Sequence, residues 1–274
     1  AGVISEQYKK KLADKTEVLE VTASDVADMK AELQNYNIFQ PNAFEQFFGK
    51  TFSLGKKDPQ KAYDKAAELF ALEYKKEIRA ASAAAKKAGK KFIESDTEIP
   101  GVSVVKRLIN TDNRGVFERL VCTSEINAWK NRPIKQINRS RTKLKGVIRG
   151  LHFQKEPFSE CKLITCLKGC VMDIAVDLRR QSATYGKSFA IELSETNNIS
   201  FLVPEGCAHG FQTLTDDVEM LYIHSAFYSA QHEDGINSLD KSLGLDWPLT
   251  CTDRSQRDKT LKTFAQYREN RVEV

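Results

Sequence analysis

The last two-thirds of the chain is a succession of short runs rich in β-branched and aromatic residues, each ended by turn-forming residues. Such runs are typical of strands, and no sustained helical period interrupts them. Ten short strands joined by turns indicate a β-sandwich or barrel. The predicted strands cover residues 102–108, 116–122, 134–142, 147–154, 162–167, 171–178, 187–192, 199–203, 208–214 and 219–225.

Residues 1–92 have a different pattern, which predicts helices. In the clearest of them, Asp58 and Pro59 form the start, Gly89 forms the end, and apolar residues between them recur on one face. No convergent set of polar residues indicates chemistry here. We therefore predict an α+β multidomain chain. An all-α helical module over residues 1–92, with a structural or protein-partner-binding role, precedes an all-β domain over residues 93–274.

Charge and apolar content exclude several classes of protein. The net charge is +5, and lysines alternate with acids instead of forming blocks, which argues against nucleic-acid binding. The apolar runs are far shorter than the roughly 20 residues of a membrane span, and the first residues do not resemble a signal peptide. The six cysteines contain no CxxC pair, which favours reduced thiols over a zinc site. We expect a cytoplasmic protein that binds neither nucleic acid nor a membrane.

The stretch from Gly146 to Gln154 carries the first candidate for chemistry. Its two glycines remove side chains where a ligand could approach, and His152 is a natural general base because histidine titrates near neutrality. Successive strand residues face opposite ways, so Arg149 and His152 should point apart unless a bulge at Gly150 re-aims one of them. Taken alone, His152 could also be a hydrogen-bonded core residue.

Three polar residues on later predicted strands accompany this histidine. Lys162, His209 and Tyr222 belong to separate strands, and inward-facing residues of a small barrel converge on one cavity. Each of them alone could be a structural residue with satisfied hydrogen bonds. Charged groups inside a barrel need polar partners, because burying them unpaired is costly. Together they therefore predict a polar cavity.

A series of ordered motifs extends over residues 97–261. They are Thr97-Glu-Ile-Pro-Gly101, Asp112-x-Arg-Gly115, Gln136-x-Asn-x-Ser140, Arg149-Gly-Leu-His-Phe-Gln154, Lys162-Leu163, Pro204-Glu-Gly-x-Ala-His-Gly-Phe211, Leu221-Tyr222 and Leu245-Asp-Trp-Pro248. In order and spacing they resemble the nucleotide-sugar 3,5-epimerases. The resemblance implies a cupin jelly-roll fold for residues 93–274, a homodimer, and epimerisation of a nucleotide-linked sugar in deoxysugar biosynthesis.

The resemblance also implies catalytic roles toward a 4-keto-6-deoxyhexose such as dTDP-4-dehydro-6-deoxyglucose. His152 would remove a proton beside the C4 ketone, Lys162 would stabilise the enolate oxygen, and Tyr222 would return a proton to the opposite face, inverting C3, C5 or both. A carboxylate would orient the histidine, and we assign this role to Asp258, with Asp253 as its rival.

Further matched positions imply contacts with the nucleotide-diphospho-sugar substrate. Arg149 and Arg114 would bind the diphosphate, because guanidinium groups suit phosphate oxygens. If no bulge at Gly150 re-aims a side chain, Arg149 would serve a phosphate at the cavity rim or on the neighbouring subunit. The other predicted substrate-binding residues are Gln136, Asn138, His209 and Tyr228.

Two departures from related patterns refine these expectations. Gln154 stands where a metal-binding cupin usually has the second histidine of a His-x-His motif, so we expect neither a metal nor any other cofactor. Phe227 precedes Tyr228 where the family often has two tyrosines, and this variation could alter how many centres are inverted. The alternatives are a monoepimerase acting on a CDP- or GDP-linked 4-keto sugar, or a non-catalytic sugar-nucleotide-binding scaffold.

Overall fold

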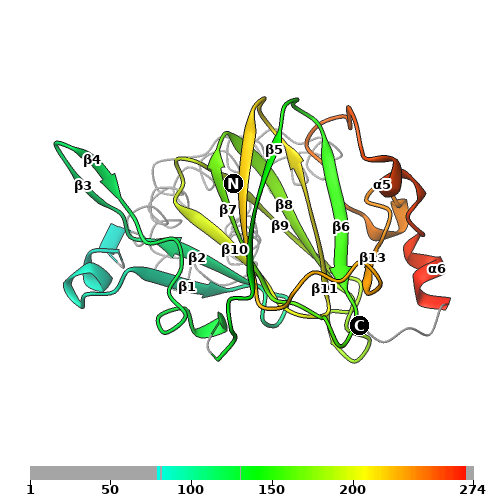
Figure 1. The fold of residues 1–274 in the computed structure, drawn as a ribbon, viewed down its shortest axis with the longest axis horizontal. Coiled ribbons are helices and arrows are strands. Elements are labelled where there is room, and N and C mark those ends of the chain that lie inside the picture. Colours follow the sequence, from blue (N-terminus) through cyan, green and yellow to red (C-terminus); the bar gives the residue numbers. More distant parts are fainter. Residues whose placement is uncertain (1–78, 81, 130, 270–274) are drawn as a thin grey trace, which may run out of the picture. The chain divides into compact units, whose positions relative to one another are not determined.

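The computed structural model describes residues 79–269 except residues 81 and 130 (Figure 1). Residues 79, 80 and 82–87 are helical, and Gly89 follows with φ +73°. The strands are β1 (Phe92–Asp96), β2 (Ser103–Arg107), β3 (Asn110–Asp112), β4 (Gly115–Phe117), β5 (Gln136–Thr142), β6 (Ile148–Gln154), β7 (Lys162–Lys168), β8 (Cys170–Asp177), β9 (Ser188–Ser194), β10 (Ile199–Val203), β11 (Cys207–Thr213), β12 (Val218–His224) and β13 (Glu233–Gly235). The short helices are η1 (Asn127–Trp129), η2 (Lys241–Leu243), α5 (Gln256–Thr260) and α6 (Phe264–Glu269).

The α+β multidomain class predicted from the sequence is wrong. The described residues are mostly β-sheet with a few short helices, and they fit a single jelly roll, as predicted for the cupin part alone. Most of the predicted all-α module lies outside the described residues, and the part described shows neither a helical module nor support for a partner-binding role. The physical reason is that a repeating apolar face reports local helix tendency and cannot show that several helices pack into a module.

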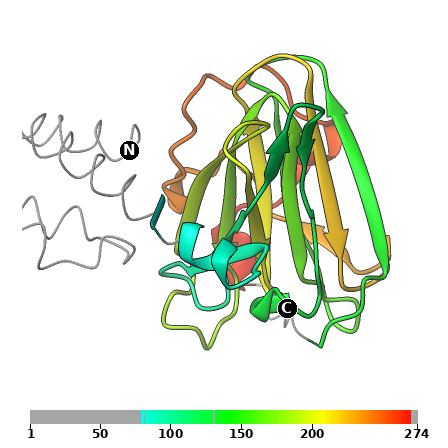
Figure 2. The ribbon, with the colours of Figure 1, turned by 90° about the vertical axis from the view of Figure 1, so that its left-hand side faces the viewer.

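Two facing sheets form the body of the jelly roll (Figures 1 and 2). The six-stranded sheet has the order β1-β2-β10-β7-β12-β5, and the five-stranded sheet has the order β13-β6-β11-β8-β9. One apolar cluster joins them, with Ile164 and Phe201 from the first sheet and Ala175 and Phe211 from the second. The alternation of strand residues therefore puts one face of each sheet toward a shared interior.

A second apolar cluster covers the other face of the five-stranded sheet. Leu151 and Phe153 of β6 pack there with Phe264 and Tyr267 of α6, and all four are buried. Phe153 and Tyr267 meet edge to face at 5.7 Å between ring centroids. The packing fixes the C-terminal segment against β6, and this segment also carries α5. No helix in the described part of the chain is long and apolar enough to cross a membrane.

Candidate active site

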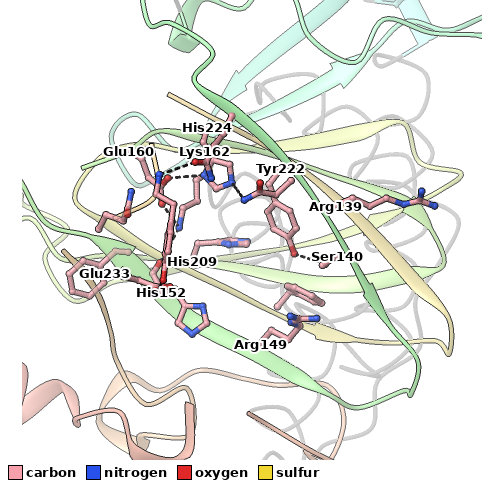
Figure 3. A pocket seen from close by; sticks show the side chains of 16 residues that line it. Arg139, Ser140, Arg149, His152, Glu160, Lys162, His209, Tyr222, His224 and Glu233 are labelled. Atoms are coloured by element: carbon pink, nitrogen blue, oxygen red, sulfur yellow. Dashed lines mark hydrogen bonds and ion pairs between the residues drawn. The ribbon is translucent and has the colours of Figure 1, made fainter. Parts of the chain in front are cut away.

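A cavity of about 290 Å³ opens between the two sheets (Figure 3). Eight of the ten site residues predicted from the sequence line it, and the two that do not are Asp258 and Arg114. The full lining comprises Gln136, Asn138, Arg139, Ser140, Arg149, His152, Phe153, Gln154, Glu160, Lys162, His209, Phe211, Tyr222, His224, Tyr228 and Glu233.

His152 forms a close pair with Asp258, one of the two acids considered for it. The His152 Nε2 to Asp258 Oδ1 distance is 2.7 Å, and the Gly150 N–H donates to the other carboxylate oxygen at 3.3 Å. Burial raises the pKa of Asp258, but these hydrogen bonds outweigh it and hold that pKa below its ordinary value. The rival Asp253 is exposed and pairs with Lys259 at 3.2 Å. Asp258 is therefore the partner of this imidazole.

A bulge at Gly150 breaks the regular alternation of β6. His152 pairs with His209 of β11 while Arg149 pairs with Phe211, so β6 has one more residue than β11 over this interval. Gly150 adopts φ +118°, and a Cβ added to it would lie 2.6 Å from the Cα of Gly210. The bulge allows Arg149 and His152 to line the same cavity, although regular strand alternation would point them apart.

The opposite wall belongs to the six-stranded sheet and presents Tyr222 and Lys162. The Tyr222 hydroxyl lies 3.1 Å from Ser140 Oγ, and burial raises the pKa of this phenol well above its ordinary value. Lys162 Nζ lies 3.1 Å from Glu160 Oε1 and donates to the His152 carbonyl oxygen at 3.4 Å. An ammonium and a phenol thus face the imidazole across the cavity.

Two more imidazole–carboxylate pairs line the interior. His209 Nε2 lies 2.6 Å from Oδ1 of Asp173, whose buried Oδ2 has no hydrogen-bond partner among the described residues. Burial raises the pKa of Asp173, and the nearby His209 only partly offsets this. His224 Nδ1 lies 2.7 Å from Glu160 Oε2. Both carboxylates are buried, and each has an imidazole as a hydrogen-bond partner.

The sequence reasoning missed Asp173, Glu160 and His224. Asp173 is the single charged residue inside the apolar run of β8, and such a residue usually has a buried partner. His224 lies two residues after Tyr222, so strand alternation alone would have put it on the same face. Glu160 lies in a loop, where no strand or helix periodicity predicts the direction of its side chain.

Tyr228 lies at the rim of the cavity. Its side chain is largely exposed, its hydroxyl donates to Glu233 at 2.9 Å, and its backbone N–H donates to Gln136 Oε1 at 2.8 Å. Arg114 lies elsewhere, on the protruding β3–β4 hairpin (Figure 1), where its side chain is 86% exposed and is bonded to Asp112. Within one chain, Arg114 is therefore not part of the cavity.

Among residues 79–269, apart from the gaps at 81 and 130, no group of three or more His, Cys, Asp or Glu side chains is arranged to hold a metal ion. The absence of a metal and of any other cofactor from the working protein stays a prediction from the sequence.

Comparison with known proteins gives a consistent result. The family model of dTDP-4-dehydrorhamnose 3,5-epimerase matches residues 96–266. A dTDP-4-dehydrorhamnose 3,5-epimerase of Shigella flexneri is 38% identical over 163 residues, which cover 59% of this chain and 90% of that protein.

Solved structures extend the likeness to the fold. The dTDP-6-deoxy-D-glucose-3,5-epimerase RmlC of Legionella pneumophila, solved with dTDP-4-keto-L-rhamnose, is 32% identical with a TM-score of 0.60, covering 63% of this chain and 92% of that one. ChmJ, a 3'-monoepimerase of Streptomyces bikiniensis solved with dTDP-quinovose, is 27% identical with a TM-score of 0.60, covering 63% and 88%. This chain belongs to the dTDP-4-dehydrorhamnose 3,5-epimerase family.

Proposed function

We propose that the protein is an isomerase that epimerises a dTDP-linked 4-keto-6-deoxyhexose at C3 and C5 in deoxysugar biosynthesis. Family membership over residues 96–266 supports this activity, and the Legionella relative was solved with a sugar nucleotide of this class. The cavity supports it too, because it combines cationic, acidic and aromatic side chains from both sheets. The cytoplasmic location stays a prediction, based on six cysteines that are all free thiols.

One observation carries the mechanism: His152 and Tyr222 line the same cavity from opposite sheets. Inversion at carbon needs a proton removed from one face and another delivered to the opposite face. His152 is proposed as the base, because Asp258 at 2.7 Å orients its ring and stabilises the imidazolium that forms. The raised pKa of Tyr222 keeps its hydroxyl protonated and ready to donate.

Lys162 is proposed to stabilise the enolate oxygen that develops at C4 after proton removal. Its side chain is nearly buried, and a fixed cation in a site shielded from water stabilises developing charge more strongly than one in solvent. Arg149 lies at the exposed end of the cavity wall and is proposed to bind the diphosphate. The proposed sugar and nucleotide contacts are Gln136, Asn138, His209 and Tyr228.

We also propose that the protein acts as a homodimer. Arg114, the residue proposed as a second diphosphate ligand, lies on a hairpin outside the cavity of its own chain, so it could reach only the cavity of another copy. Exposed Val116 and Phe117 on the same hairpin are apolar surface that a second copy would cover. Light scattering should give the mass of a dimer, and a strict monomer would contradict this proposal.

Deuterium exchange tests the activity directly. The protein is incubated with dTDP-4-keto-6-deoxyglucose in D₂O, and NMR then locates the deuterium, which we expect at both C3 and C5. Deuterium at one centre only would make the protein a monoepimerase like ChmJ. CDP- and GDP-linked 4-keto sugars, tested in parallel, decide the nucleotide. Absence of exchange with every one of these sugars would refute the enzyme assignment and leave a binding scaffold.

A further inference from the structure

Glu160 and His224 form a buried network with Lys162 on the six-stranded wall of the cavity (Figure 3). The two oxygens of the Glu160 carboxylate have different partners. Oε1 lies 3.1 Å from Lys162 Nζ, and Oε2 lies 2.7 Å from His224 Nδ1. The other ring nitrogen of His224, Nε2, lies 3.4 Å from Asn138 Nδ2. Glu160, Lys162 and His224 are buried, whereas Asn138 on the edge strand is exposed.

The strand register explains why a carboxylate is needed here. Lys162 and His224 are direct neighbours across β7 and β12, and their side chains point to the same face. Two groups that can both carry positive charge repel each other when directly opposed on a sheet. Burial raises the pKa of Glu160, but the charge of Lys162 and the hydrogen bond from His224 outweigh it, so the pKa is below its ordinary value. The carboxylate therefore stays charged between its two neighbours.

The hydrogen bonds of His224 define how its imidazole is used. A carboxylate at Nδ1 keeps the proton on that nitrogen, so Nε2 can accept from the Asn138 amide. Hydrogen bonds thus run from edge strand β5 through β12 to the loop before β7. The donation from His224 also draws the charge of Glu160 away from the ammonium, which leaves more of the field of Lys162 directed at the cavity.

Lys162 has a long flexible side chain, so its ammonium needs such partners to stay in one position. Its Nζ also donates to the carbonyl oxygen of His152 at 3.4 Å, across the cavity on the other sheet. With Glu160 on one side and this carbonyl on the other, the ammonium is held between the two walls. Its placement relative to a bound sugar therefore depends on the conformation of Glu160.

We propose that Glu160 and His224 are positioning residues that hold the Lys162 ammonium at the developing enolate oxygen. This inference rests on the epimerase function proposed above. Glu160 sets the position of Nζ, and His224 sets the position of Glu160 and withdraws part of its charge. The network acts on the transition state, because the oxygen carries full charge only after the proton has left.

Three variants test the inference by kcat and KM for the 4-keto sugar nucleotide. His224→Leu removes the donor to Glu160 and should lower kcat by on the order of 10- to 100-fold, as expected for a catalytic group displaced by about 1 Å, with KM little changed. His224→Gln keeps an amide donor and should recover most of kcat. Glu160→Gln keeps the shape but loses the charge that holds Lys162, so its kcat should also fall.

Glu205→Gln is the matched control. Glu205 pairs with Arg132 at 2.7 Å and is also part-buried, but it does not line the cavity, so the same chemical change should leave kcat unaltered. Circular dichroism and thermal melting report whether each variant is folded. If His224→Leu does not fold, the near-isosteric Glu160→Gln decides the outcome.

Wild-type kcat in both His224→Leu and Glu160→Gln would overturn the inference. So would a loss in His224→Leu that the glutamine variant does not recover, because that indicates a packing role. A rise in KM alone would indicate a substrate contact and would also overturn it. Inactivity of the wild-type protein on every sugar nucleotide would overturn the proposed function and this inference together. In the outcomes above, the wild-type protein is active and only the inference fails.

Discussion

Replacing Gly150 with alanine should destabilise the protein and disable the site, because two features of the bulge exclude a side chain. The backbone adopts φ +118°, which residues with a Cβ rarely adopt. An added Cβ would also lie 2.6 Å from Gly210 Cα and 2.7 Å from the carbonyl oxygen of His209, both backbone atoms of the paired strand β11. Backbone atoms in a paired strand cannot rotate away, so β6 and β11 must separate locally.

The expected loss of unfolding free energy in Gly150→Ala is the sum of a backbone-dihedral cost and a close-contact cost. The unfavourable φ costs about 1–3 kcal/mol, and forcing atoms apart in a packed interior costs about a further 1–3 kcal/mol. Gly115 provides a matched control, because it has a similar φ of +129° and no atom of the structurally described residues lies within 4 Å of an added Cβ. Gly115→Ala should show the first cost alone. Subtracting its loss of unfolding free energy isolates the cost of the close approach at Gly150.

Urea unfolding followed by circular dichroism gives the two free energies, and the deuterium-exchange assay gives activity. Gly150→Ala should lose more stability than Gly115→Ala by about 1–3 kcal/mol. It should also lose kcat, because His152 and Arg149 flank the bulge on either side. Equal destabilisation of the two variants, with full activity in Gly150→Ala, would refute the reasoning that the close approach at Gly150 fixes these side chains.

Three further predictions concern the ionisable groups. Asp258→Asn should lower kcat by several orders of magnitude while dTDP binding persists, because an amide neither stabilises the imidazolium nor holds the same tautomer; titration of dTDP by calorimetry and the exchange assay check this. The pKa of Asp258 is depressed in the folded protein, so its ionised form contributes stability above the ordinary carboxyl value of about 3.9, and that contribution is lost as pH falls through the folded pKa. Thermal melting from pH 7 to pH 3 should therefore show a smaller acid-induced loss in Asp258→Asn than in wild type. Arg149→Lys should raise KM and weaken dTDP binding with a smaller change in kcat, because an ammonium cannot bind a phosphate in the bidentate manner of a guanidinium; an unchanged KM would contradict the diphosphate role.

Strand positions could be predicted wherever hydrophobic burial alone determines them. The predicted strand over residues 199–203 coincides with β10, which is buried along most of its length. The predicted strand over residues 116–122 extends too far, because the strand there is Gly115–Phe117, entirely exposed on a two-stranded hairpin. Glu118 then leaves the hairpin and pairs with Arg107 at 2.7 Å. An apolar run at the surface has the same composition as one in the core, so periodicity could not separate them.

Site residues that belong to one sequence motif could be predicted. Contacts between residues from distant segments of the chain could not. The opposite parity of Arg149 and His152 left two possibilities, a bulge at Gly150 or an Arg149 that serves a phosphate at the rim or on another subunit, and the register of β6 and β11 shows the bulge. The choice of Asp258 over Asp253 did not follow from spacing. It depends on α5, where the Ser255 hydroxyl accepts from the Asp258 N–H at 3.0 Å and turns this carboxylate toward β6. Such a contact joins segments more than a hundred residues apart.

The imidazoles of the three imidazole–carboxylate pairs line one cavity, yet their exposure separates their roles. The side chain of His152 is 29% exposed, whereas those of His209 and His224 are 6% and 10% exposed. A general base must reach a proton on the substrate, so only the first pair has the access that proton abstraction needs. The buried pairs are suited to binding the substrate, as proposed for His209, or to holding a neighbouring group in place, as proposed for His224 through Glu160. Burial therefore assigns proton abstraction to the His152 pair and leaves the other two imidazoles for binding or positioning, although all three pairs share the same chemistry.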